Sequence, residues 1–270
     1  MKTIIFHSYK GGTGKTTIAL NIAMQLAQNG YKVLAVDADI GSPTFDSLFL
    51  GGLKNYYIND FFEYDLDQPK EKPASKTLTP FNVKDLLLPG PHENLQLIYA
   101  KEQPKFGQGL LSMDKDFHKN ALKQLYVFKS EIEKLGYDFL IMDTSPSLNL
   151  FSINTIIIAD AAILVLRPNR YGFSGTTFLL KELYALLGTL NRKDYILFNQ
   201  VIPNSMGFIS AWEKRFQEEF NVETIGVIQC DCSLALEMLY GQIFNHLKNT
   251  DFRKTIEEII NRLINDLEVK

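Results

Sequence analysis

The chain has 270 residues, of which 46% are hydrophobic and 22% charged, a balance typical of a globular protein with one sizeable core. Its net charge of −3 excludes a global basic field that would hold DNA or anionic lipid, although a local patch is compatible with it. No apolar run approaches the ~20 residues of a membrane span.

Apolar runs without polar alternation recur along the chain and predict parallel strands that are buried on both faces. They lie at 3–7, 33–37, 95–99, 138–142, 161–166, 195–199 and 224–228. Helical patterns lie near 15–29, 114–135, 148–159, 174–190, 207–220, 233–247 and 251–268. The alternation predicts an α/β fold over 1–270, with a doubly wound, mostly parallel sheet flanked by helices and a ligand at the carboxyl ends of its strands.

The first predicted strand leads into a glycine-rich loop that opens a helix, with Lys-Gly-Gly-Thr-Gly-Lys-Thr-Thr at residues 10–17. Glycines let backbone N–H groups converge on phosphate oxygens, and the helix N-terminus adds partial positive charge. Lys15 would supply a charge to the β- and γ-phosphates, and the Thr16 hydroxyl can hold Mg²⁺. The predicted nucleotide site comprises Gly11, Gly12, Thr13, Gly14, Lys15, Thr16 and Thr17.

Aspartates end two further predicted strands. Asp37 and Asp39 follow the second strand in Asp-Ala-Asp-Ile-Gly-Ser-Pro, and Asp143 ends the fourth in Asp-Thr-Ser-Pro. An apolar strand that delivers one aspartate is the Walker B arrangement, in which the carboxylate binds Mg²⁺ directly or through water. An Asp pair that caps a turn is common by itself, but its place one helix after the phosphate loop favours a role in the site.

Tyr9 stands where the standard phosphate loop has its first glycine, and Lys10 follows it. In this respect residues 10–17 resemble the deviant P-loop of the ParA/MinD family. The resemblance implies that Asp39 orients the attacking water, that Asp37 lies near the Mg²⁺ shell, and that Thr144 to Pro146 form switch II. It also implies that Lys10 crosses a dimer interface to touch the partner's phosphates.

ATP is the expected nucleotide. The chain has no Asn-Lys-x-Asp motif, which argues against GTP, and Asn199 occupies the position at which the family contacts adenine. The loop after the seventh strand usually contains Ile-Pro in the family, whereas this chain has Ile228-Gln229-Cys230 there.

The resemblance implies a cytoplasmic ATPase that hydrolyses ATP to ADP and phosphate as a Mg-ATP sandwich homodimer. Slow turnover, stimulated by a protein partner, would time the positioning or segregation of DNA or a cellular machine. The start of the chain, which runs directly into the phosphate loop, leads us to expect no cleaved signal peptide. Two alternatives stay open: a metallochaperone-type ATPase that uses Cys230 and Cys232 across a dimer, and a nucleotide-gated interaction module with negligible turnover.

Two segments lie outside these motifs. Proline and mixed charge at about 50–93 predict an exposed, partly irregular insertion, and a surface insertion is favoured over a partner-binding element. The helix at 251–268 carries one apolar stripe. The stripe comprises Phe252, Ile256, Ile259, Ile260, Leu263, Ile264 and Leu267. Its mixed-charge polar face favours packing on the sheet over membrane binding.

Basic residues offer a local route to DNA. Arg167, Arg170, Arg192 and Lys193 are candidates for a DNA-binding patch or for scattered surface charges. DNA therefore stays an open partner.

Overall fold

The computed structural model describes residues 1–49, 54–63, 82–102, 115–146, 150–188 and 191–269. Its centre is an eight-stranded sheet in the order β3-β4-β2-β5-β1-β6-β7-β8. The strands are β1 Lys2–His7, β2 Val33–Ala38, β3 Leu88–Pro89, β4 Leu95–Ile98, β5 Phe139–Thr144, β6 Ala161–Leu166, β7 Lys193–Val201 and β8 Glu223–Gln229. All neighbours pair in parallel except β3, which is antiparallel to β4. The α/β prediction is confirmed.

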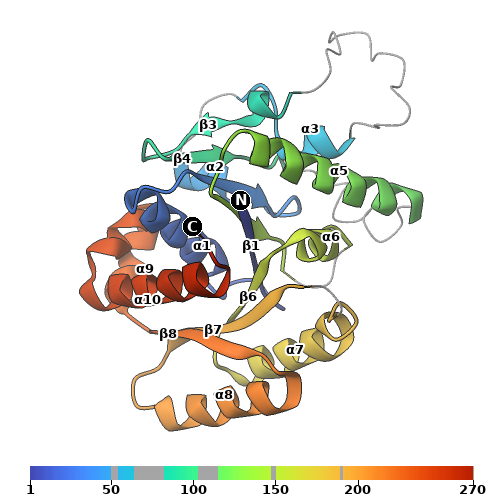
Figure 1. The fold of residues 1–270 in the computed structure, drawn as a ribbon. Coiled ribbons are helices and arrows are strands. Elements are labelled where there is room, and N and C mark those ends of the chain that lie inside the picture. The colour runs from blue at the N-terminus through green and yellow to red at the C-terminus, as the bar shows by residue number, and fades with distance from the viewer. Residues whose placement is uncertain (50–53, 64–81, 103–114, 147–149, 189–190, 270) are drawn as a thin grey trace.

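Helices cover both faces of the sheet (Figure 1). The α-helices are α1 Lys15–Gln28, α2 Phe45–Phe49, α3 Ile58–Glu63, α5 Lys115–Lys134, α6 Leu150–Ile158, α7 Arg170–Leu179, α8 Met206–Phe220, α9 Cys232–Leu239 and α10 Thr250–Asp266. Two 3₁₀ segments, η1 Val83–Leu86 and η3 Ile243–Lys248, and one π-helical turn, η2 Leu180–Tyr184, complete them. One core lies under α1 and α10, and the other under α5 to α8.

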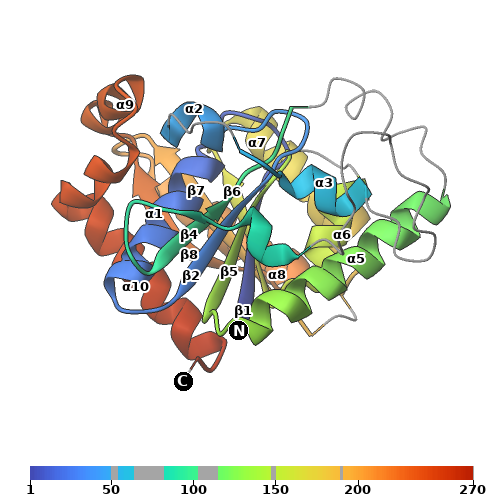
Figure 2. The ribbon, with the colours of Figure 1, turned by 90° about the horizontal axis from the view of Figure 1, so that it is seen from above.

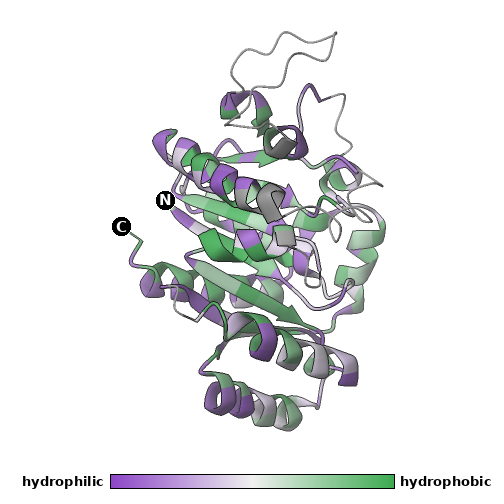
Figure 3. Ribbon diagram, turned by 90° about the vertical axis from the view of Figure 1, so that its right-hand side faces the viewer, coloured by the Kyte–Doolittle hydropathy of each residue, from purple (hydrophilic) through white to green (hydrophobic). Residues whose placement is uncertain are grey.

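Three central strands are buried along their whole length, as their apolar runs predict. Every residue of β2, β5 and β6 is buried. Figure 3 shows the sheet as a largely hydrophobic layer between helices that carry much of the hydrophilic surface. A sheet covered on both faces leaves its strand ends as the natural place for a ligand.

Two predicted helices differ from the structure. The helix expected at 233–247 is not continuous, because Gly241 between α9 and η3 has φ of 68°, which an α-helix cannot accommodate. The helix expected to begin at 174 begins at Arg170 instead. There the Asn169 side chain accepts a hydrogen bond from the Gly172 N–H at 2.8 Å and caps the helix.

The segment at 50–93 was expected to be exposed, and for part of it this is wrong. Ile58 and Phe61 of α3, with Val83 and Leu86 of η1, are buried in the core beside α5. β3 adds a short antiparallel edge strand. Residues 50–53 and 64–81 of this segment lie outside the described residues.

The apolar stripe of α10 is covered by the rest of the fold. Phe252, Ile256, Ile259, Ile260 and Leu263 are all at most 5% exposed, and α10 packs on β8 and α1. Gly226 on β8 permits this close approach, since a Cβ there would lie 2.8 Å from Ile259 Cδ1. Among the described helices, none combines the length and apolarity that crossing a membrane requires.

The burial of α10 predicts that truncation of its stripe destabilises the whole chain. Ile260 is fully buried, so Ile260→Ala should lower the free energy of unfolding by about 2–4 kcal/mol through lost burial and a residual cavity. Urea denaturation followed by circular dichroism measures this loss. Lys254→Ala, an exposed position on the same helix, should change stability by less than about 0.5 kcal/mol. Equal stability of both variants would contradict the packing role.

Candidate nucleotide-binding and catalytic site

The glycine-rich loop lies where β1 meets α1, at the carboxyl edge of the sheet. Figure 2 shows α2, α7 and α9 near this edge and both chain ends at the opposite edge. Gly12 and Gly14 have φ of 75° and 84°, values that disfavour any side chain. Gly14 is the N-cap residue of α1 and brings no side chain to the helix end. The loop therefore presents backbone at a helix N-terminus, the arrangement that suits an anion.

Asp143 is the centre of the predicted site. It ends β5, where the sheet register places it between Phe6 on β1 and Asp37 on β2. The buried Lys15 ammonium forms an ion pair with its Oδ1. The Thr16 hydroxyl donates to its Oδ2 at 2.5 Å. The structure thus joins Lys15, Thr16 and Asp143 through direct contacts, although the first two belong to the glycine-rich loop and Asp143 ends a strand far along the chain.

Asp37 is fully buried beside Asp143, and its environment opposes ionisation. Burial first, and the Asp143 carboxylate second, raise the pKa of Asp37 to about 7. The N–H groups of Thr44 and Phe45 donate to its Oδ2 and that of Asp39 to its Oδ1, which partly opposes the rise.

The donor set around Asp143 suits a magnesium ion. A hydroxyl from Thr16 and carboxylates from Asp37 and Asp143 are the hard oxygen ligands that Mg²⁺ prefers. A divalent cation would also offset the two adjacent buried carboxylates, which the single Lys15 ammonium balances only in part.

Asp39 lies at the end of β2 and is tied to the loop after β5. Its Oδ1 accepts the Ser145 hydroxyl at 2.7 Å and the Ser42 N–H at 3.1 Å. The motif pattern alone predicts no role for the Ser145 side chain. Its place in Asp-Thr-Ser-Pro was visible, but its partner lies 106 residues away.

Asn199 reaches the phosphate loop. Its Nδ2 donates to the Thr13 carbonyl at 2.8 Å, and a Cβ on Gly14 would lie only 2.3 Å from the same Nδ2. Gly14 is thus required both for its backbone conformation and for this close approach. The adenine contact expected of Asn199 stays a prediction, and the structure shows an additional role in holding the loop.

Tyr9, which replaces the first glycine of the standard motif, packs against α7. A Cβ on Gly175 would lie 2.0 Å from Tyr9 Cδ1, so only glycine at 175 admits the ring. The Tyr9 and Phe178 rings also meet edge to face, with centroids 6.0 Å apart. The departure from the usual motif is therefore matched by a glycine on the neighbouring helix.

Lys10 has an environment unlike that of Lys15. It is exposed, and its Nζ lies 4.8 Å from the centroid of the Tyr171 ring, at the start of α7. A cavity of about 220 Å³ separates the phosphate loop from α7, and Lys10, Arg167 and Tyr171 contribute to its lining.

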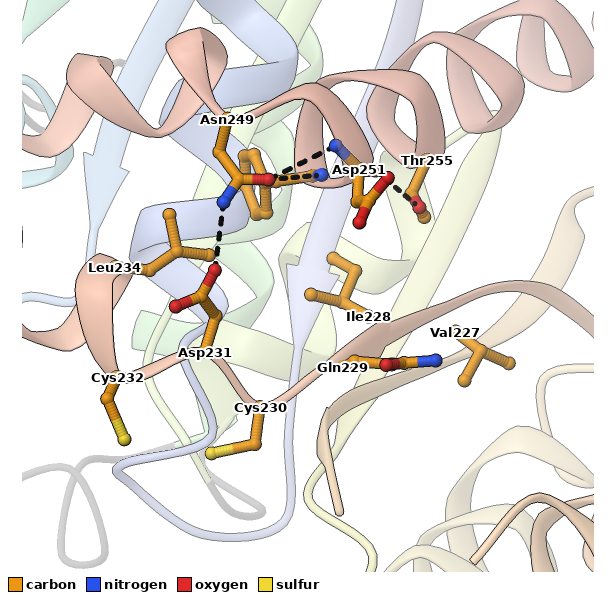
Figure 4. Close-up of a pocket in the computed structure, with 11 residues that line it drawn as sticks. Val227, Ile228, Gln229, Cys230, Asp231, Cys232, Leu234, Asn249, Asp251 and Thr255 are labelled. Carbon is orange, nitrogen blue, oxygen red and sulfur yellow. Dashed lines mark hydrogen bonds between the residues drawn. The ribbon is translucent and has the colours of Figure 1, made fainter. Parts of the chain in front are cut away.

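The cysteine pair lies at the end of β8, in the wall of another cavity of about 330 Å³ (Figure 4). Both thiols are free and exposed. The Asp231 side chain, between the two cysteines, points away from the thiols (Figure 4). It caps α9 and accepts a hydrogen bond from Asn249 Nδ2 at 2.8 Å. In the part of the chain that the structure describes, no group of three or more His, Cys, Asp or Glu side chains could hold a metal. Among these described residues, the two cysteines therefore lack the further ligands that a thiolate metal site within one chain would need.

The four basic residues considered for DNA binding do not form one patch. Arg167 and Arg170 follow the carboxyl end of β6, whereas Lys193 pairs with the amino end of the same strand. The two ends of a six-residue strand lie roughly 17 Å apart. Arg192 also pairs with Asp194 and donates to the Ile156 carbonyl, so it is engaged within the fold.

A phosphate loop with Lys15 and Thr16 on a strand-end aspartate defines a P-loop nucleotide-binding protein. The family described as "AAA domain" matches residues 1–196. With relatives named for MinD, ParA and Soj, this match shows that the chain belongs to the ParA/MinD family of P-loop ATPases.

The chain is 29% identical over 245 residues to an uncharacterised protein of Methanocaldococcus jannaschii, and the alignment covers 84% of each chain. It is 29% identical over 191 residues to the chromosome-partitioning ATPase Soj of Treponema pallidum, with 70% of this chain and 66% of that one covered. Among solved structures, the septum site-determining protein MinD of Pyrococcus horikoshii, complexed with Mg-ADP, superposes with a TM-score of 0.67 at 20% identity. That superposition covers 97% of this chain and 95% of that one, and it supports the fold.

The pKa of Asp37 predicts a pH-dependent stability for the nucleotide-free chain. Because the folded value, about 7, lies above the ordinary value of 3.8, the folded chain binds more protons than the unfolded chain between these values. The free energy of unfolding should therefore fall as pH rises through this window. The part due to Asp37 should amount to a loss on the order of 2 kcal/mol between about pH 5 and about pH 7.5, measured by urea denaturation without Mg²⁺.

A variant that is neutral at every pH isolates this contribution. Asp37→Asn should lack this part of the slope, whereas Asp85→Asn, at an exposed position on η1, should keep it. The same pH slope in Asp37→Asn and in the unmodified chain would show that Asp37 is not the group responsible.

Proposed function

We propose that this chain is a cytoplasmic, Mg-ATP-dependent ATPase that dimerises around its nucleotide and hydrolyses ATP slowly until a protein partner stimulates it. The hydrolysis would time the positioning or partitioning of a cargo, either DNA or a cellular machine. One observation carries the proposal. Lys15 and Thr16 meet on Asp143, beside Asp37 and at the same carboxyl edge of the sheet as Asp39.

The charges of the side chains at this edge of the sheet suit the binding of Mg-ATP. In the structure Asp143 accepts hydrogen bonds from both Lys15 and Thr16. When bound, Mg²⁺ would supply positive charge that offsets both the carboxylates and the phosphates. Thr16, Asp37 and Asp143 would hold it, and Lys15 would be free to contact the phosphates. The Mg-ADP named with the Pyrococcus horikoshii MinD structure supports the same ligand class for this chain.

Hydrolysis needs a group that orients water, and Asp39 is our candidate. It is 8% exposed and lies two residues beyond Asp37, at the carboxyl end of β2. A carboxylate there can accept a proton or a hydrogen bond from a water next to the γ-phosphate. The Soj relationship supports the partitioning role, while cargo and partner remain part of the proposal.

Lys10 would complete the site of a second copy. Lys15 is buried and engaged with Asp143, whereas Lys10 is exposed at the outer side of the same loop. An exposed cation beside the phosphate cradle can reach a facing protomer, where it would stabilise the partner's phosphate charge. ATP would then be required for the two copies to close.

Asp39→Ala should slow ATP hydrolysis by about a hundredfold or more while nucleotide binding is retained, because the water loses its orienting carboxylate. The variant should accumulate as an ATP-bound dimer. Phosphate release and light scattering measure the two effects. Asp85→Ala, which removes an exposed carboxylate on η1, should behave as the unmodified chain. Unchanged turnover in Asp39→Ala would remove Asp39 from the chemistry.

Lys10→Ala should keep nucleotide binding in the monomer yet lose dimerisation driven by a non-hydrolysable ATP analogue. The reason is that an unpaired phosphate charge would face the partner. Calorimetry measures the binding, and light scattering measures the dimer. Lys214→Ala, at an exposed lysine on α8, is the matched control and should dimerise normally. Dimerisation by Lys10→Ala at the level of the control would reject the contact in trans.

These measurements also separate the proposal from a nucleotide-gated module. Such a module would dimerise with ATP but release no phosphate, either alone or with any candidate partner.

A further inference from the structure

We propose that Ser145 is a positioning residue for Asp39. Its hydroxyl fixes one oxygen of the Asp39 carboxylate, so that the other oxygen is presented to the attacking water. This inference rests on the proposed ATPase function and names a residue that the motif pattern leaves without a side-chain role.

Two donors converge on one oxygen of Asp39. The Ser145 Oγ lies 2.7 Å from Oδ1, and the Ser42 N–H donates to the same atom at 3.1 Å. Both side chains are nearly enclosed, with Ser145 6% and Asp39 8% exposed. Among the hydrogen bonds recorded for the described residues, none goes to Asp39 Oδ2. The carboxylate is therefore held against rotation, and Oδ2 is the oxygen left to accept from water.

The backbone that carries the Ser145 hydroxyl is itself anchored. Its carbonyl accepts the Ser152 hydroxyl of α6 at 3.2 Å. The preceding Thr144 donates to the Phe6 carbonyl of β1 at 2.8 Å. These contacts fix the hydroxyl relative to β1, the strand that leads into the phosphate loop.

The bond also links the metal carboxylate to the water-orienting carboxylate. Asp143 lies two residues before Ser145, so one short segment contacts both the proposed Mg²⁺ site and Asp39. A shift of this segment on nucleotide binding or phosphate release would move the Asp39 carboxylate with it. Alignment of Asp39 would then depend on the state of the nucleotide site.

A positioning role and a merely structural role predict different kinetics. Ser145→Ala should lower kcat by about ten- to hundredfold, since a misplaced orienting group costs rate even when binding persists. KM for ATP and the melting temperature should stay close to those of the unmodified chain. Ser145→Thr, which keeps the hydroxyl, should restore most of kcat, and Ser145→Cys, of similar size but a weak donor, should not.

Two further variants make the experiment decisive. Ser205→Ala removes a hydroxyl that donates to the Ile202 carbonyl, far along the chain from Asp39, and should leave kcat unchanged. In an Asp39→Ala background, adding Ser145→Ala should cause no additional loss of kcat, because Ser145 acts through Asp39.

The outcomes are distinguishable. If the unmodified chain hydrolyses ATP and Ser145→Ala matches it within twofold, the positioning role is overturned and the ATPase proposal stands. A lower melting temperature together with parallel losses in binding and kcat would show a structural role and would also overturn it. If the unmodified chain releases no phosphate, both the proposed function and this inference fail.

Discussion

The site depends on two carboxylates placed side by side by the sheet. The β2–β5 register pairs Asp37 with Asp143, and Lys15 supplies a buried ammonium that pairs with Asp143. The excess of negative charge is reflected in the pKa of Asp37, which burial and the Asp143 carboxylate raise to about 7. This edge of the sheet is therefore short of positive charge at the strand ends, while the adjacent glycine loop is suited to an anion. A metal bound to a phosphate supplies positive charge to the carboxylates and negative charge to the glycine loop. Neither a bare anion nor a bare cation does both.

Local sequence signals were enough to predict the elements that carry this site. Continuous apolar runs locate the inner strands because both of their faces are buried, and the glycine spacing locates the loop because Gly12 and Gly14 need positive φ. Asp37 and Asp143 could be assigned to the same edge because parallel strands end together. Their direct adjacency could not be assigned, since it follows from a strand order that places β5 between β1 and β2.

The features that were missed depend on distant partners, on a single backbone angle, or on elements too short to give a helical pattern. The bonds from Ser145 to Asp39 and from Asn199 to Thr13 span 106 and 186 residues, and no local periodicity reports them. The break between α9 and η3 depends on one positive φ at Gly241. The short elements α3 and η1 contribute only a few buried side chains each, too few to produce a helical pattern.

The two lysines of the loop carry the same ammonium group, but their different positions suit them to different roles. They lie five residues apart, yet Lys15 is 7% exposed and paired with Asp143, while Lys10 is exposed above the Tyr171 ring. A cation over an exposed aromatic face is held by only about 0.5–1 kcal/mol, so Lys10 can leave Tyr171 at little cost. Lys15 cannot leave Asp143 so readily unless positive charge replaces it, because a buried unpaired carboxylate is strongly unfavourable. The same loop thus carries one lysine that responds to metal and nucleotide and another that is free to respond to a second protein surface.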